Sequence, residues 1–273
     1  MIKQPRDLNG MVVAITGASA GIGRALAIEL AGAGARLVLG ARRLELLEVL
    51  NGELGGGHVC VRTDVANPAD CAAFVAAAHT RFGRLDTLVC NAGFAFLRSI
   101  ADTSAAEWRE LLAINLGGTS DCIRAALPLL LAQERRQGCR GQILVVSSCL
   151  ARRALPDLGA YAATKAAQLS LVEALRVELA GTGVVASAML PVGTDTEFKA
   201  VAQERSTRTM LPPGRFEIRQ SAATVAACMV RGIVQPAPEL WSHAPSRWIA
   251  SLATFMPGVA DRVLGRVRRL VGH

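Results

Sequence analysis

Between residues 11 and 190 the chain alternates short, strongly apolar runs with longer segments of helical periodicity. Strands that are apolar throughout are typical of a parallel sheet that helices cover on both faces, with right-handed crossovers. The sequence therefore predicts an α/β fold, with a doubly wound parallel sheet as the middle of three α/β/α layers. The expected strands are 11–16, 36–40, 58–64, 85–93, 141–148 and 184–190, and the expected helices are 22–35, 43–52, 68–83, 104–135 and 160–181.

The stretch TGASAGIG, at residues 16–23, directly follows the first expected strand and opens the first expected helix. Gly17, Gly21 and Gly23 let the backbone turn tightly and let a diphosphate approach the helix N-terminus. A turn without a ligand is the alternative, but the strand–turn–helix context favours dinucleotide binding in a Rossmann-type fold. Because the chain has no internal repeat and no low-complexity linker, we predict a single dinucleotide-binding and catalytic domain over residues 1–273.

The end of the second expected strand bears on the choice of cofactor. A dinucleotide-binding fold places there either an acid that binds the ribose 2′-hydroxyl or a basic residue that holds a 2′-phosphate. In this chain Arg42 and Arg43 follow the strand, and the first acid is Glu45. Two arginines suit a phosphate dianion. The sequence therefore predicts NADP(H), and the alternative is that both arginines are solvated residues at the start of a helix.

Tyr161 and Lys165 lie four residues apart in the segment YAATK, so on a helix both side chains rise from the same face. A lysine ammonium beside a phenol favours the phenolate and lowers the tyrosine pKa from about 10. Such a phenol could move protons near neutral pH. An isolated pair of this kind more often lies on a solvated helix face, so its interpretation depends on the rest of the chain.

These motifs occur in an order that resembles the short-chain dehydrogenases/reductases. The resemblance covers roughly residues 9 to 235, and the combination is far more specific than any single motif. It implies an oxidoreductase that transfers hydride with a nicotinamide cofactor. The motifs are TGxxxGxG at 16–23, Asp64-Val65, NAG at 91–93, Asn115 in LLAINLGGT, the serine pair at 147–148 and YxxxK at 161–165.

The resemblance implies a catalytic group of four residues. Tyr161 would be the acid/base, and Lys165 would lower its pKa and bind the hydroxyls of the nicotinamide ribose. Ser148, thirteen residues before the tyrosine, would hydrogen-bond the substrate carbonyl, with Ser147 as the fallback. Asn115 would hold a water in the proton relay.

The resemblance also implies the cofactor contacts. Asp64 would accept from the adenine amine, residues 91–93 would line the adenosine ribose, and Thr194 and Thr196 would bind the nicotinamide carboxamide. The expected NADP(H)-binding residues are Gly17, Ser19, Gly21, Ile22, Gly23, Arg42, Arg43, Asp64, Val65, Asn91, Ala92, Gly93, Tyr161, Lys165, Pro191, Thr194 and Thr196.

Two departures from the family pattern bear on the site. Val192 stands where the family usually has a glycine after the sixth strand, which weakens the assignment of the two threonines. Ala151-Arg152 replaces a small Ala-Gly step near the expected substrate mouth. That change argues against transferring the substrate of any one family member to this chain.

The composition excludes several other classes of protein. The net charge of +8 could attract nucleic acid, but only 4% of the residues are aromatic and they do not cluster with basic residues. The seven cysteines form no CxxC pair, which indicates reduced thiols in a cytoplasmic protein. The histidines and cysteines share no metal-ligand spacing, so we expect no metal site. The start has no apolar signal region, and no apolar run reaches ~18 residues.

Beyond residue 196 the pattern loosens. Residues 196–215 are polar, basic and punctuated by Pro and Gly, which suits a mobile substrate loop, and a helix is expected at 220–232. Residues 245–273 form a C-terminal helical extension with apolar side chains at helical spacing and five arginines. We expect its apolar faces to pack on the substrate lobe or on a neighbouring subunit. The alternative is a basic amphipathic element in peripheral contact with an anionic membrane.

The sequence therefore predicts an NADP(H)-dependent oxidoreductase that interconverts a small-molecule ketone and a secondary alcohol. One alternative is a 3-oxoacyl-carrier-protein reductase, which a basic surface would suit. Another is a non-catalytic, NADP(H)-binding redox sensor, which the presence of all four expected catalytic residues disfavours. The resemblance implies a homodimer or homotetramer built on the long helices at 104–135 and 160–181.

Overall fold

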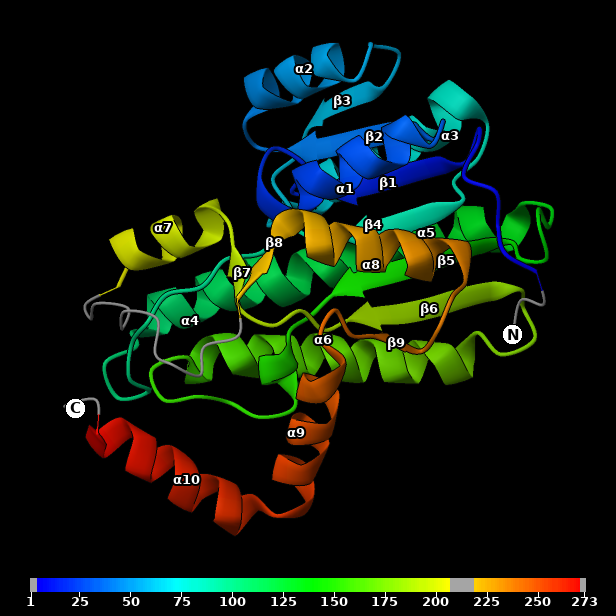
Figure 1. Cartoon of the computed structure of the whole chain (residues 1–273). Helices are drawn as coiled ribbons and strands as arrows, with labels where there is room; N and C mark the ends of the chain where they lie inside the picture. Colours follow the sequence, from blue (N-terminus) through cyan, green and yellow to red (C-terminus); the bar gives the residue numbers. More distant parts are fainter. Residues whose placement is uncertain (1–3, 207–218, 271–273) are drawn as a thin grey trace.

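The centre of the molecule is a seven-stranded parallel sheet with the order β3-β2-β1-β4-β5-β6-β9 (Figure 1). The computed structural model describes residues 4–206 and 219–270. The predicted doubly wound α/β sheet is confirmed. The strands of this sheet are β1 (Val12–Thr16), β2 (Arg36–Ala41), β3 (Val59–Arg62), β4 (Thr87–Cys90), β5 (Gly141–Val146), β6 (Val184–Met189) and β9 (Glu239–Leu240).

Helices cover both faces of the sheet, because successive side chains of each strand point to opposite faces. Val13 and Ile15 of β1 pack with α1, α2 and α8, whereas Val12 and Ala14 pack with α3, α5 and α6. The helices are α1 (Gly21–Gly32), α2 (Leu44–Glu53), α3 (Pro68–Phe82), α4 (Ala105–Leu111), η1 (Leu112–Gly117), α5 (Gly118–Ala132), η2 (Cys149–Ala151), α6 (Gly159–Glu178), α7 (Glu197–Glu204), α8 (Ala222–Val234), α9 (Ala244–Phe255) and α10 (Pro257–Leu270).

The helix expected over 104–135 is divided into three pieces. It begins as predicted with a capping box, in which Ser104 and Glu107 satisfy each other's backbone N–H groups. The middle piece, η1, is a π-helix that carries Asn115, and it ends beside Gly118. A Cβ on Gly118 would lie 2.6 Å from the Cβ of Val65, so the chain passes close to that loop. π-helical segments occur frequently at functional sites.

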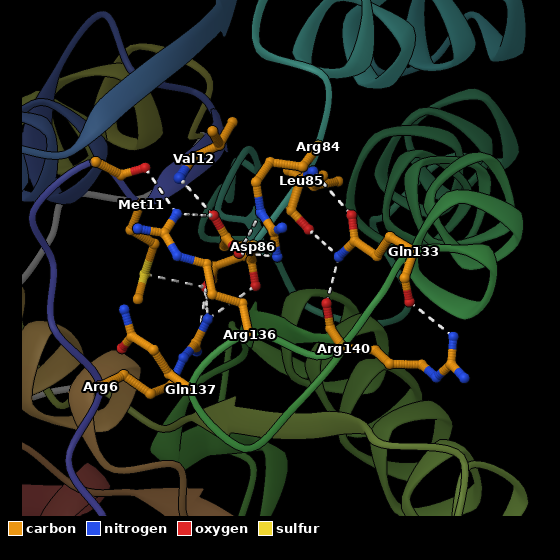
Figure 2. A network of polar contacts seen from close by, with 12 residues as sticks. Arg6, Met11, Val12, Arg84, Leu85, Asp86, Gln133, Arg136, Gln137 and Arg140 are labelled. Atoms are coloured by element: carbon orange, nitrogen blue, oxygen red, sulfur yellow. Dashed lines mark hydrogen bonds and ion pairs between the residues drawn. The ribbon is translucent and has the colours of Figure 1, made fainter.

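The edge of the sheet at the amino ends of the strands is closed by a buried polar network (Figure 2). The guanidinium of Arg6 donates to Oε1 of Gln142 at 2.9 Å and to the carbonyl oxygens of Asp86 and Ile233. The Asp86 carboxylate accepts from the backbone N–H of Val12 at 2.9 Å. Because these partners belong to β1, β5, α8 and the residue before β4, the network joins the first described residues of the chain to the sheet.

The region after β6 differs from the expectation. Residues 197–204, expected within a mobile loop, form α7, and 207–218 of that loop lie outside the described residues. Two short strands that were not expected, β7 (Thr194–Asp195) and β8 (Gln220–Ser221), pair in parallel on either side of this segment. The C-terminal extension forms α9 and α10. Within 4–206 and 219–270, no helix is long and apolar enough to cross a membrane.

Candidate active site

The glycine loop between β1 and α1 lies where the strand order of the sheet reverses, between β1 and β4. Gly17 and Gly21 have φ angles of +67° and +56°, a region that favours glycine. A Cβ on Gly23 would lie 2.3 Å from the carbonyl oxygen of Gly17, so a side chain there would clash with backbone. The residue preceding α1 is Ala20, whose side chain makes no capping hydrogen bond. The N-terminus of α1 therefore suits an external anion.

Asn91 and Ala92 lie against this loop. Nδ2 of Asn91 donates to the carbonyl oxygens of Thr16 and Gly17, at 3.0 and 3.2 Å. The Thr16 hydroxyl in turn accepts from the backbone N–H groups of Asn91 and Ala92. These bonds hold the carboxyl ends of β1 and β4 together. Asn91 thus supports the shape of the loop through contacts with protein backbone.

Arg43 reaches from the end of β2 into the same region. Its guanidinium donates to Oγ of Ser19 at 3.4 Å and pairs with the Glu197 carboxylate at 3.1 Å. The sequence analysis did not single out Glu197, which is the first residue of α7. Both members of the pair are about half exposed, and such pairs contribute little to stability. Arg42 is exposed beside them.

Ser148 and Tyr161 form the polar centre of the site. Ser148 follows β5, and Tyr161 lies in the first turn of α6. Burial raises the pKa of Tyr161, and the nearby Ser148 hydroxyl opposes that rise. The fallback, Ser147, donates its hydroxyl to the carbonyl oxygen of Lys165 at 2.8 Å and is buried, so it is tied to α6. Ser148 is therefore the better placed of the two serines.

Lys165 lies beside the Tyr161 ring, with Nζ 5.6 Å from the ring centroid. Its ammonium donates to the carbonyl oxygen of Val146 and to Oε1 of Gln168, each at 2.9 Å. Burial lowers the pKa of Lys165 to about 7. Burial therefore disfavours the charged forms of both side chains, and the expected lowering of the Tyr161 pKa by Lys165 stays a prediction.

Asn115 is buried, and its side-chain and carbonyl atoms make hydrogen bonds to protein groups. Its side-chain amide donates to Thr164 and to the carbonyl of Phe94, and its Oδ1 accepts from the Phe94 N–H, all at 3.0 Å. Its carbonyl oxygen accepts from Nε2 of Gln168 at 2.6 Å and from the Thr119 hydroxyl at 2.8 Å. These bonds tie η1 to α6 and α5, and the water-holding role of Asn115 stays a prediction.

Gln168 and Phe198 are two site residues that the sequence analysis missed. Gln168 lies three residues after Lys165, so helical spacing could have placed it beside the lysine. Phe198 of α7 lies against Tyr161, with the ring centroids 5.8 Å apart. No sequence signal pointed to Phe198, because its segment was expected to be a loop. α7 is held at its far end by the pairing of Arg205 with Glu110 of α4.

The remaining predicted cofactor residues surround the same edge of the sheet. Asp64 accepts from the N–H of Ala66 at 3.0 Å and so closes a turn after β3, and Val65 is buried beside it. Thr196 lies next to the glycine loop, because a Cβ on Gly21 would meet its Cβ at 3.2 Å. The others lie nearby along the chain: Ile22 in α1, Pro191 after β6, and Thr194 in β7, bonded to the carbonyl of Val192.

The chain belongs to the short-chain dehydrogenase family. The family model described as short chain dehydrogenase matches residues 11–207. The uncharacterized oxidoreductase Lin0452 of Listeria innocua is 35% identical over 205 residues, which cover 73% of this chain and 81% of that protein. Glycine betaine reductase ATRR of Emericella nidulans is also 35% identical, over 200 residues and 72% of this chain, but the match spans only 15% of that protein.

Solved structures agree with this assignment. A short-chain dehydrogenase/reductase from Burkholderia phymatum in complex with NAD superposes with a TM-score of 0.82 at 27% identity, covering 93% of this chain and 96% of that one. A short-chain dehydrogenase from Burkholderia cenocepacia in complex with NADP gives 0.78 at 26% identity, covering 95% and 99%. The protein is thus an oxidoreductase of this family, whose structural neighbours bind NAD or NADP.

A dinucleotide fits the residues of this site. The uncapped N-terminus of α1 suits the diphosphate. The glycines of the loop let protein atoms pack closely, because a Cβ on Gly17 would lie 3.0 Å from Asn91 and a Cβ on Gly23 would lie 2.3 Å from the carbonyl oxygen of Gly17. Gly93 packs in the same way, since a Cβ there would lie 3.0 Å from Oδ1 of Asn115 and 3.5 Å from Nζ of Lys165. The glycines therefore shape the loop and bring Gly93 next to Lys165.

Proposed function

We propose that the protein interconverts a ketone and a secondary alcohol with NADP(H), using Tyr161 as the acid/base. The observation that carries this proposal is that Ser148 and Tyr161 lie close together, with Nζ of Lys165 5.6 Å from the centroid of the Tyr161 ring. A bound nicotinamide would supply or accept the hydride. Negative charge grows on the carbonyl oxygen during reduction, so the Ser148 and Tyr161 hydroxyls would donate to it, and Tyr161 would deliver the proton.

The reverse reaction needs the Tyr161 phenolate, which takes the proton of the alcohol. Burial raises the pKa of Tyr161, so nearby positive charge has to offset this cost. Each unit of pKa corresponds to about 1.4 kcal/mol, so a drop of ~3 units needs about 4 kcal/mol. A protonated Lys165 and the positive charge of an oxidised nicotinamide are the two sources that this site offers.

The preference for NADP(H) over NAD(H) is supported by Arg42 and Arg43 at the end of β2. Arg43 lies within hydrogen-bonding distance of Ser19 in the glycine loop, so a 2′-phosphate beside that loop would meet its guanidinium. Glu197 already pairs with Arg43, and its carboxylate would compete with the phosphate. The preference therefore depends on how readily that exposed pair opens.

The test is a panel of ketones and secondary alcohols, assayed with both cofactors at the nicotinamide absorbance. We expect turnover with at least one carbonyl substrate, and faster turnover with NADPH than with NADH. Tyr161→Phe keeps the ring but removes the exchangeable proton, so kcat should fall by ~10² or more while NADPH still binds. Near-normal turnover in this variant would remove Tyr161 from the mechanism.

A further inference from the structure

Helix α9 turns its large apolar side chains away from the body of the protein. Trp248, Leu252 and Phe255 lie along one stripe of the helix, and Trp248 and Phe255 are 73% and 85% exposed. The buried residues of α9 are Ser246 and Ala250, which lie roughly half a turn away from that stripe. This stripe therefore does not pack on the body of the same chain, and the expected packing on a neighbouring subunit stays a prediction.

Helix α10 has the same orientation. Asp261 pairs with Arg153, so the side of α10 that carries Asp261 faces the body. Val259 and Val263 lie one turn apart on the opposite side, and both are exposed. Met256, between the two helices, is exposed as well. Figure 1 shows α9 and α10 projecting beyond the layer that contains α6.

The two helices carry a strong positive charge. Residues 244–270 contain five arginines and one acid, Asp261, which is paired with Arg153. Arg262 and Arg266 are exposed and follow the valine stripe at its edge, and Arg247 precedes Trp248. An apolar stripe with tryptophan and phenylalanine, bordered by arginines, is the pattern of a helix that lies in the interface of an anionic bilayer.

We propose that α9 and α10 form a docking surface for the anionic face of a lipid bilayer, with Trp248 and Phe255 as the apolar anchors. The positive charge of the two helices favours an anionic bilayer over a second copy of the chain. A symmetric contact between two copies would bring two arginine-rich surfaces together, whereas anionic headgroups complement them. Exposed apolar patches of this kind mark interaction surfaces, since water does not favour them.

The docking surface is attached to the body next to the catalytic group. The Thr254 hydroxyl lies 3.5 Å from the carbonyl oxygen of Arg152, and Asp261 pairs with Arg153. Arg152 is itself anchored by Glu173 of α6 and Glu239 of β9. These contacts place the two helices against the segment that follows Ser148.

The test is sedimentation of the whole protein with vesicles of phosphatidylcholine, either alone or mixed with phosphatidylserine. We expect binding to the mixed vesicles only, and release by added salt, because salt screens the attraction. Arg262→Gln combined with Arg266→Gln should weaken binding by roughly tenfold or more, since each arginine near a negative surface contributes about fivefold. Trp248→Ser combined with Phe255→Ser should abolish binding, and both side chains are exposed, so the fold should survive.

The matched control is Val177→Ser on α6, an equally exposed apolar residue, which should leave binding unchanged. Circular dichroism and NADPH binding verify that each variant is folded. The proposal is wrong if the whole protein does not bind the anionic vesicles. It is also wrong if the Val177 control loses as much vesicle binding as the Trp248 and Phe255 variant. Light scattering measures the oligomeric state and so tests the other possible occupant, a second copy of the chain. If the whole protein does not bind vesicles and forms an oligomer that the Trp248 and Phe255 variant disrupts, the surface mediates contact between copies of the chain.

Discussion

Lys165 and Gln168 face each other across one turn of α6, with Nζ of the lysine 2.9 Å from Oε1 of the glutamine. The Gln168 amide uses its nitrogen to donate to the carbonyl oxygen of Asn115 and to the Thr119 hydroxyl. All four side chains are buried. A single neutral amide therefore connects the lysine to η1, and it sets the surroundings in which Lys165 gains or loses its proton.

Two different substitutions of Gln168, to Leu and to Glu, should shift the pH profile of the reaction in opposite directions. Gln168→Leu removes the acceptor of the ammonium, which lowers the pKa of Lys165, so the alkaline loss of activity should move to lower pH. Gln168→Glu places a carboxylate beside the ammonium, so the same loss should move to higher pH. The measurement is kcat/KM against pH for the three proteins. A uniform loss of activity with no shift in either variant would show that Gln168 is only structural.

The free energy of unfolding should depend on pH through Lys165. Burial lowers its pKa to about 7 in the folded protein, whereas an unfolded lysine titrates near 10.4. Below pH 7 both states are charged, and the folded state bears the full cost of burial. Between pH 7 and 10.4 the unfolded state binds more protons, so stability rises with pH by at most about 1.4 kcal/mol per unit.

Lys165→Met removes this titration and keeps most of the volume. The stability advantage of the variant over the parent should therefore shrink by roughly 2 kcal/mol between pH 7 and pH 9. Urea unfolding at both pH values, followed by circular dichroism, measures the difference. A difference in the free energy of unfolding between the two proteins that stays constant from pH 7 to pH 9 would mean that Lys165 keeps an ordinary pKa.

Glu197→Gln should increase the preference for NADPH. The substitution removes the carboxylate that pairs with Arg43, so the guanidinium becomes available to a 2′-phosphate. An exposed pair is worth up to about 1 kcal/mol, so the ratio of the NADH and NADPH dissociation constants should rise by up to about fivefold. Glu204→Gln, at the other end of α7, is the control. An unchanged ratio in the Glu197 variant would show that Arg43 does not contact the phosphate.

Arg6→Met should destabilise the fold without altering the site chemistry. Arg6 is 4% exposed, and its loss leaves buried acceptors on Gln142, Asp86 and Ile233 without this donor. Each unsatisfied buried group costs about 1–3 kcal/mol, so we expect a loss of about 2–4 kcal/mol. Urea unfolding measures it, with the exposed Arg109→Met as control. Equal stability of the two variants would mean that the network is replaceable.

The sequence by itself determined six of the seven strands of the sheet, all but β9, because alternating apolar and helical periodicity indicates which segments are buried. The six strands it predicted are present, and the glycine loop lies where the strand order reverses. The spacing of Tyr161 and Lys165 placed both on one helix. Local pattern was enough for these features, since each depends on residues within a few turns of one another.

Only the tertiary structure decided the electrostatics of the site and the direction of the last two helices. Burial lowers the pKa of Lys165, whose ammonium bonds to Gln168. Gly118, which follows π-helix η1, packs closely against Val65. Helical spacing predicted an apolar stripe on α9, and in the structure α9 buries Ser246 and Ala250 while that stripe is exposed. Periodicity in the sequence defines an apolar face of a helix, whereas contacts between distant residues determine whether that face packs on the protein or is exposed.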